Sequence, residues 1–166
     1  IGQVGPGSQL RAYFDYLSDG ELAWNRLPDA YDRFVYPGID FSASSNPVEY
    51  QQKLIDTFPT EARAIRRYFR DIRSANRWVT LGFAKNMVPR PIAPLLHGIQ
   101  WISGRTALGT TEHYLKKHFR SPELRALLAS QWGDYGLPPS RSAFAKHALI
   151  VDHYLNGGWF PAGGSA

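Results

Sequence analysis

Two glycine pairs near the carboxyl end of this 166-residue chain form its clearest pattern for ligand chemistry. Gly157-Gly158 and Gly163-Gly164 bracket the aromatic corner Trp159-Phe160-Pro161. Glycine accepts a positive φ and lets a ligand approach the backbone closely, and proline stiffens the segment that leads into the second pair. We therefore expect a functional loop. Because the sequence starts at Ile1 rather than Met and stops at Ala166 just beyond this loop, we expect it to be part of a longer protein.

Other signatures of catalysis and binding are missing from the sequence. No Gly-x-Gly-x-x-Gly lies between a predicted strand and helix, so the chain alone is not expected to hold NAD or FAD firmly. The five histidines lack metal-site spacing, and no Gly-x-Ser-x-Gly frame surrounds Ser165. Asp134 and Asp152 are candidate acid/base groups, although such lone carboxylates are usually solvated. We identify no catalytic residue and expect no metal.

Length, charge and cysteine content restrict the class of protein. The length suits one domain, the absence of cysteine fits a cytoplasmic protein, and no apolar run approaches the roughly 18 residues of a membrane span. A net charge of +5 suits an anionic partner. Five arginines recur every three or four residues on one predicted helix, at Arg63, Arg66, Arg70, Arg73 and Arg77. This stripe is either a solvated face or a docking surface, and it lacks the interleaved aromatics of a nucleic-acid site.

The elements that must position the glycine loop are mainly helical, with a small β-hairpin (α+β). Hydrophobic periodicity and capping residues predict helices at about 10–17, 47–57, 61–88, 111–119, 122–132 and 142–155. Asn46 and Thr60 are the predicted caps of the second and third helices. Strands at 32–36 and 39–42 flank a Pro37-Gly38 turn, and we expect further strands to join this hairpin.

Two segments have alternative interpretations. The apolar stretch Pro89–Ile102 is either an interfacial segment or a buried helix. The last helix is apolar nearly all round, so we expect it to be buried, with one side facing either other side chains or a cavity. Its His147 and His153 are then either hydrogen-bonded structural residues or ligand contacts.

Four motifs in one order resemble the phytoene dehydrogenase and retinol saturase group of FAD-dependent oxidoreductases. They are Tyr135-Gly136-x-x-Pro139, His147-Ala148, His153-Tyr154-x-x-Gly157 and Phe160-Pro161-x-Gly163-Gly164. Upstream, Phe58-Pro59 with the long helix, the hairpin at 33–42 and the opening Ile1-Gly2 are also similar to that group. The resemblance covers essentially the whole chain.

The resemblance implies that this chain is the substrate-binding part inserted in a split flavin-oxidoreductase fold. The flavin fingerprint would precede Ile1, and more of both domains would follow Ala166. Such enzymes move hydride equivalents between FAD and carbon–carbon bonds of apolar polyenes, either desaturating or saturating them. The isolated chain is then expected to be inactive and to carry no FAD.

The resemblance also assigns candidate residues. Flavin-binding positions would be Pro161, Gly163, Gly164 and Ser165. Substrate-binding positions would be Tyr135, Phe144, Trp159 and Phe160. The apolar stretch at 90–102 would be a candidate for peripheral membrane contact, because a polyene substrate arrives from lipid. Two alternatives stay open: a stand-alone helical module that binds a hydrophobic or lipid-like molecule, and a basic domain that docks a partner through the arginine stripe.

Overall fold

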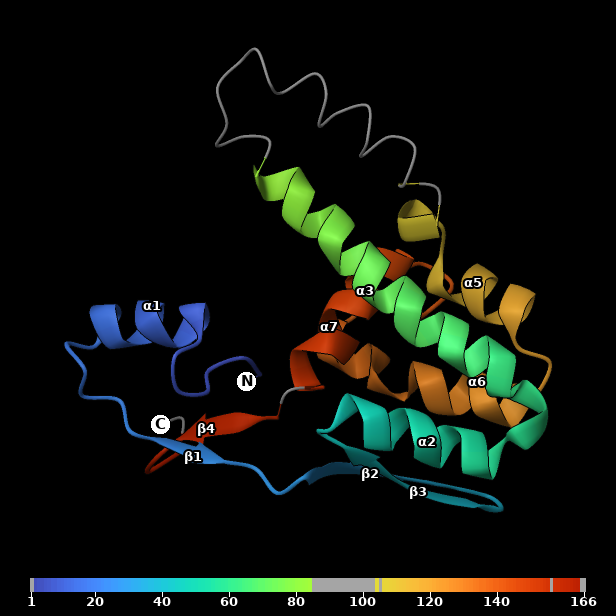
Figure 1. Ribbon diagram of the computed structural model, residues 1–166, viewed down its shortest axis with the longest axis horizontal. Coiled ribbons are helices and arrows are strands. Elements are labelled where there is room, and N and C mark those ends of the chain that lie inside the picture. Colours follow the sequence, from blue (N-terminus) through green and yellow to red (C-terminus); the bar gives the residue numbers. More distant parts are fainter. Residues whose placement is uncertain (1, 85–103, 105, 156, 165–166) are drawn as a thin grey trace, which may run out of the picture. The chain divides into compact units, whose positions relative to one another are not determined.

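The chain divides into two compact units in a computed structural model, which describes residues 2–84, 104, 106–155 and 157–164 (Figure 1). Unit 1 comprises Ile1–Lys53 and His153–Ala166, and unit 2 comprises Leu54–Asp152. The described residues are mainly helical with a little antiparallel strand, which confirms the predicted α+β class. Unit 1 is therefore built from both ends of the sequence, whereas unit 2 is continuous.

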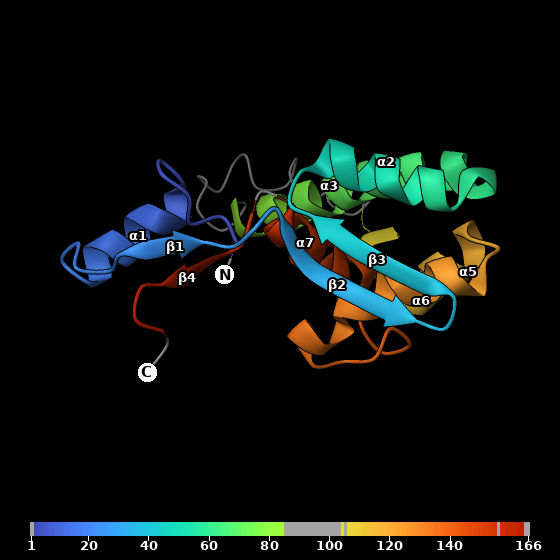
Figure 2. The same ribbon diagram turned by 90° about the horizontal axis from the view of Figure 1, so that it is seen from below.

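Unit 1 contains a helix, a hairpin and a second strand pair (Figures 1 and 2). Its elements are α1 (Gln9–Leu17), β1 (Trp24–Arg26), β2 (Ala30–Tyr36), β3 (Ile39–Ser44), the first turns of α2 (Pro47–Thr57), and β4 (Trp159–Pro161). The β2–β3 hairpin is confirmed, with Gly38 at φ +78° in its turn. In the described part of the chain this sheet has two strands only. The β1–β4 pair was not predicted.

Helix α1 buries none of its side chains. Ser8 caps it, since its hydroxyl accepts a hydrogen bond from the Arg11 amide at 3.3 Å. Phe14 meets the ring of Trp24 edge-on, with centroids 5.0 Å apart, while Tyr16 and Leu17 stay about four-fifths exposed. The apolar side chains of α1 thus contact the β1–β4 ribbon through few residues.

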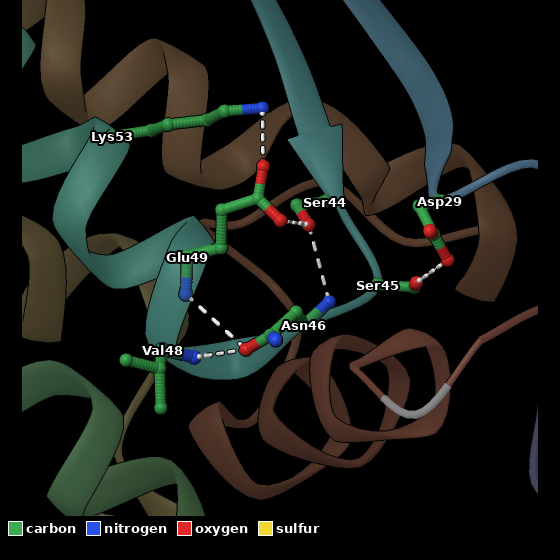
Figure 3. A network of polar contacts seen from close by, with 7 residues as sticks. All are labelled: Asp29, Ser44, Ser45, Asn46, Val48, Glu49 and Lys53. Carbon is green, nitrogen blue, oxygen red and sulfur yellow. Dashed lines mark hydrogen bonds and ion pairs between the residues drawn. The ribbon is translucent and has the colours of Figure 1, made fainter.

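The start of α2 is fixed by the predicted cap. The Asn46 Oδ1 accepts hydrogen bonds from the amides of Val48 and Glu49 (Figure 3). The Glu49 carboxylate does not return to the Asn46 amide as in a capping box. It accepts a hydrogen bond from the Ser44 hydroxyl at 2.8 Å and pairs with Lys53 at 2.9 Å. The cap thereby joins the end of β3 to the first turns of α2.

Unit 2 packs its helices around a core of aromatic rings. Its elements are the end of α2, α3 (Ala62–Ala84), α5 (Thr111–His118), α6 (Pro122–Ala129), a 3₁₀ segment at Ser130–Tyr135, and α7 (Phe144–Tyr154) as far as Asp152 (Figure 1). Tyr68 of α3 lies at the centre, with its ring 5.6–6.4 Å from Phe69, Tyr114, Phe119 and Phe144. These contacts tie α3 to α5 and α7, as edge-on and tilted aromatic pairs do in protein cores.

The start of α3 differs from the prediction. Thr60 is not its cap, because Pro59–Glu61 form a 3₁₀ turn that leads directly into the helix. The Glu61 carboxylate is buried and one oxygen, Oε1, accepts hydrogen bonds from the amides of Arg120 and Ser121, at 2.7 and 2.9 Å. These amides precede α6, so Glu61 connects the beginnings of two helices.

Part of the sequence-based description cannot be compared with the structure. The predicted end of the long helix at 85–88, the segment Pro89–Ile102 and Ser165 lie outside the described residues. In the parts that are described, no helix has both the length and the apolar character that crossing a bilayer requires.

Glu61→Ala is expected to lower the free energy of unfolding by about 2–3 kcal/mol, because two partly buried amides lose a charged acceptor. Glu61→Gln keeps a neutral oxygen and should cost less. Urea denaturation of the 166-residue chain measures both effects. The control is Glu21→Ala at an exposed position, which should change stability by no more than about 0.5 kcal/mol. A Glu61→Ala variant as stable as this control would contradict the role of Glu61.

Candidate functional site

The β1–β4 ribbon and the turn that follows it carry most of the predicted site residues. Trp24 pairs with Pro161, Asn25 with Phe160 and Arg26 with Trp159. Two further backbone hydrogen bonds extend the pairing at its ends, from the Leu27 amide to the Gly158 carbonyl at 2.9 Å and from the Ala162 amide to the Ala23 carbonyl at 2.8 Å. The aromatic corner is therefore a strand held along its whole length, not an irregular loop.

The second glycine pair forms a tight turn directly after β4. The Gly164 amide donates to the Pro161 carbonyl at 3.1 Å, and Gly163 and Gly164 have φ of +90° and +92°. A positive φ in the third residue is what a type II turn demands. A side-chain carbon placed on either glycine would meet no atom within 4 Å. The turn thus presents bare backbone to open space.

Close packing, not conformation, explains the glycines at the base of the ribbon. Gly2 forms an isolated antiparallel bridge with Gly158, and its amide donates to Nε2 of His153 at 2.6 Å. A side-chain carbon on Gly2 would lie 1.7 Å from the His153 carbonyl oxygen, and one on Gly158 would lie 2.6 Å from a methyl of Leu27. Larger residues cannot fit at either position without moving the backbone or Leu27.

Trp159 and Phe160 point to opposite faces of β4, as successive strand residues do. The indole of Trp159 lies 3.5 Å from the position that a side-chain carbon on Gly5 would take, so it covers the amino-terminal segment. Phe160 keeps 42% of its surface exposed. Of the two predicted substrate contacts on this strand, Phe160 is exposed and Trp159 is half-buried.

Tyr135 and Phe144, the other two predicted substrate contacts, belong to unit 2. Phe144 has no exposed surface and stacks on Tyr114 with centroids 3.9 Å apart. Tyr135 is 8% exposed, and Lys146 Nζ lies 6.0 Å from the centre of its ring. Burial raises the pKa of Tyr135, and the hydroxyls of Ser142 and Thr111 oppose that shift. Both rings are core residues of unit 2, so the structure does not gather the predicted contacts within one unit.

Both histidines of α7 are hydrogen-bonded, as the first of the two interpretations predicts. His153 accepts a hydrogen bond from the Gly2 amide, and Nε2 of His147 forms a hydrogen bond of 2.7 Å with the Tyr68 hydroxyl. Burial lowers the pKa of His147 to about 4. The protonated ring carries an N–H on both nitrogens, and Nδ1 has no hydrogen-bond partner in the described part of unit 2. The buried ring is therefore neutral at physiological pH.

The remaining sequence candidates stay separate from the ribbon. Asp134 is exposed and Asp152 is half-buried. In the described segments, no group of three histidine or acidic residues is placed to hold a metal ion. The five arginines of the stripe on α3 are all exposed, as expected for a face opposite the core.

Comparison with known proteins gives one group of relatives. The chain is 29% identical, over its whole length, to the all-trans-retinol 13,14-reductases of Rattus norvegicus and Homo sapiens, and equally identical over 99% of its length to that of Danio rerio. It spans 29% of the length of these relatives. The similarity confirms the resemblance to retinol saturase that the four motifs predict. No protein-family model matches the chain, and neither does any solved structure.

His147 should make unfolding depend on pH. An unfolded histidine has a pKa of about 6.5, whereas that of folded His147 is about 4, so the stability that the neutral ring contributes is present above 6.5 and lost as pH falls toward 4. The loss should reach roughly 3 kcal/mol. We expect the stability difference between wild type and His147→Phe to shrink by that amount between pH 7 and pH 4 in urea titrations.

Two results would argue against this assignment of His147. One is a stability difference that stays constant between pH 7 and pH 4. The other is an imidazole signal of His147 that titrates near 6.5 in the NMR spectrum of the folded wild-type chain.

Proposed function

We propose that this chain is the substrate-binding part of an FAD-dependent oxidoreductase that saturates or desaturates carbon–carbon bonds of an apolar, retinoid-like polyene. The observation that carries the proposal is the similarity of the whole chain to all-trans-retinol 13,14-reductases. Their name states a reduction at positions 13 and 14 of all-trans-retinol, which is a polyene alcohol. A related reaction would need an apolar binding surface next to a redox cofactor.

The discontinuous make-up of unit 1 supports an inserted position for this segment. Gly2 and Gly158 pair directly although 156 residues separate them in the sequence. Insertion of one domain into another is tolerated where the two connections lie close together. In unit 1, Gly2 lies next to Gly158, just before β4, so the two connections of such an insertion would lie close together.

The residues of the turn after β4 fit the close approach of a flavin ring. Gly163 and Gly164 leave free the space that a side chain would fill, and both have a backbone conformation that other residues rarely adopt. When bound, FAD would supply the hydride chemistry. We assign to Pro161, Gly163 and Gly164 the role of bringing backbone close to the ring. Ser165 keeps the same predicted role by its place directly after the motif.

The aromatic residues of the ribbon would position the substrate. Phe160 offers an exposed ring at the side of the turn, and burial of such a ring against a polyene is favourable and excludes water. Trp159 supports the strand from its other face through its contact with the amino-terminal segment. Neither residue needs to exchange a proton with the substrate, since we assign them binding and orientation only.

Gly164→Val in the longer oxidoreductase should reduce flavin content or turnover about tenfold, because a β-branched side chain strains a φ of +92° and fills the space beside the turn. The control is Gly38→Val in the β2–β3 turn, where φ is +78° and the surrounding space is equally open. Flavin absorbance per protein and steady-state turnover are the measurements. Normal flavin loading and turnover in Gly164→Val would refute the placement of the turn.

Phe160→Ala should raise KM for the polyene about tenfold with little change in kcat, since the lost contact acts on binding. Val35→Ala, at a position on β2 that is 68% exposed, serves as the control and should leave both constants unchanged. Equal KM values for the two variants would remove Phe160 from the substrate site and leave the flavin assignment intact.

A further inference from the structure

A cavity of about 360 Å³ in unit 2 shares no residue with the glycine turn. Nearly all of its side chains can donate a hydrogen bond or carry a positive charge. The cavity is lined by Thr106, Thr110, His113, Tyr114, Lys117 and His118, together with Gly109. The sequence analysis did not identify it, because these residues match no known binding motif.

Helix α5 brings four of these side chains together. His113 and Lys117 are four residues apart, as are Tyr114 and His118, so each pair lies one turn apart on the helix. The rings of Tyr114 and His118 are 4.6 Å apart. The Tyr114 hydroxyl donates to the Asp71 carboxylate of α3 at 2.8 Å, which fixes this ring as one wall of the cavity.

The charges around the cavity are mostly positive. Lys116 forms an ion pair with Glu112, with 2.8 Å between the ammonium and the carboxylate. In contrast, no carboxylate in the described residues lies within 4.0 Å of the Lys117 ammonium. Asp71, the acidic group that acts on His118, is already paired with Arg67 at 3.3 Å. Lys117 is therefore a cation without a protein counter-ion in this part of the chain.

The hydroxyl groups of the cavity favour a ligand that accepts hydrogen bonds. The Thr110 Oγ1 accepts a hydrogen bond from the His113 amide at 3.2 Å. The hydroxyl proton of Thr110 is therefore free to be donated to a ligand. Together with Thr106, His113, Lys117 and His118, it gives donors on several sides of the space. A tetrahedral oxyanion has acceptor oxygens in as many directions, whereas a planar carboxylate has two.

We propose that this cavity binds a phosphate-type oxyanion, with Lys117, His113 and His118 in direct contact with it. The anion is either a free phosphate ion or the phosphate group of an organic monoester. The cavity shares no residue with the turn after β4, and its ligand would supply the counter-ion that Lys117 lacks in the described part of the chain.

Binding should be visible in the titration of His118. Burial, followed by the positive charge of Arg67, lowers the pKa of this imidazole, with smaller contributions from Lys117 and His113, while Asp71 opposes them. A bound dianion stabilises the protonated ring. Saturating phosphate should therefore raise the pKa of His118, and by linkage the protonated ring should bind the anion more tightly.

The test is an NMR titration of the 166-residue chain with sodium phosphate, at ionic strength held constant with sodium chloride. We expect saturable shifts of the His113 and His118 imidazole signals and an upward shift of the His118 pKa. Lys117→Ala should weaken phosphate binding about tenfold, the loss of one charge-assisted hydrogen bond. The matched control is Lys116→Ala on the same turn of α5, which should stay within about twofold.

A parallel titration with glycerol 3-phosphate identifies the source of the anion. Tighter binding of glycerol 3-phosphate assigns the site to an organic monoester, and equal or tighter binding of inorganic phosphate assigns it to the free ion. Shifts that do not saturate, or equal weakening by Lys116→Ala and Lys117→Ala, would overturn the proposal. Both lysines are exposed, so neither substitution should disturb folding.

Discussion

Unit 1 depends on pairing between backbone segments that lie at opposite ends of the sequence. Gly2 bridges Gly158, and β1 pairs with β4 a few residues further on. The hydrogen bond from the Gly2 amide to His153 closes the same contact from the end of α7. Because a side chain on Gly2 would overlap the His153 backbone, the pairing requires glycine there. The aromatic corner and the turn after it take their position from this junction, so the candidate site exists only when both ends of the segment are in place.

Unit 2 solves a different problem, that of burying polar groups inside an aromatic core. Three of these groups are matched with partners from other elements: Nε2 of His147 with Tyr68, the Tyr114 hydroxyl with Asp71, and the Glu61 carboxylate with two backbone amides. An unmatched polar group in such a core costs more free energy than its hydrogen bond contributes when made. These contacts therefore specify which faces of the helices meet, beyond what apolar packing alone would select.

Features set by neighbouring residues could be predicted from the sequence, and those set by distant pairing could not. Asn46 caps α2 and the hairpin turns at Gly38 because both depend on short-range backbone geometry. Thr60 has the right residue type for a cap, yet it lies inside the 3₁₀ turn that begins at Pro59. The β1–β4 ribbon was not predicted, because strands of three residues are too short to show an alternation of apolar and polar side chains. In the candidate site, the open glycine turn followed from its residues, but the inward packing of Trp159 depends on Gly5, more than 150 positions away.

The sparse anchoring of α1 has a consequence for the motions of unit 1. With no buried side chain and one edge-on ring contact to the ribbon, α1 has little apolar contact to lose when it detaches. Regions of this kind open locally at a small fraction of the free energy of global unfolding. Amide protons of α1 should accordingly exchange with solvent long before those of α3, whose rings fill the core of unit 2. The amino-terminal helix can thus undock and return while the paired strands beside it stay intact.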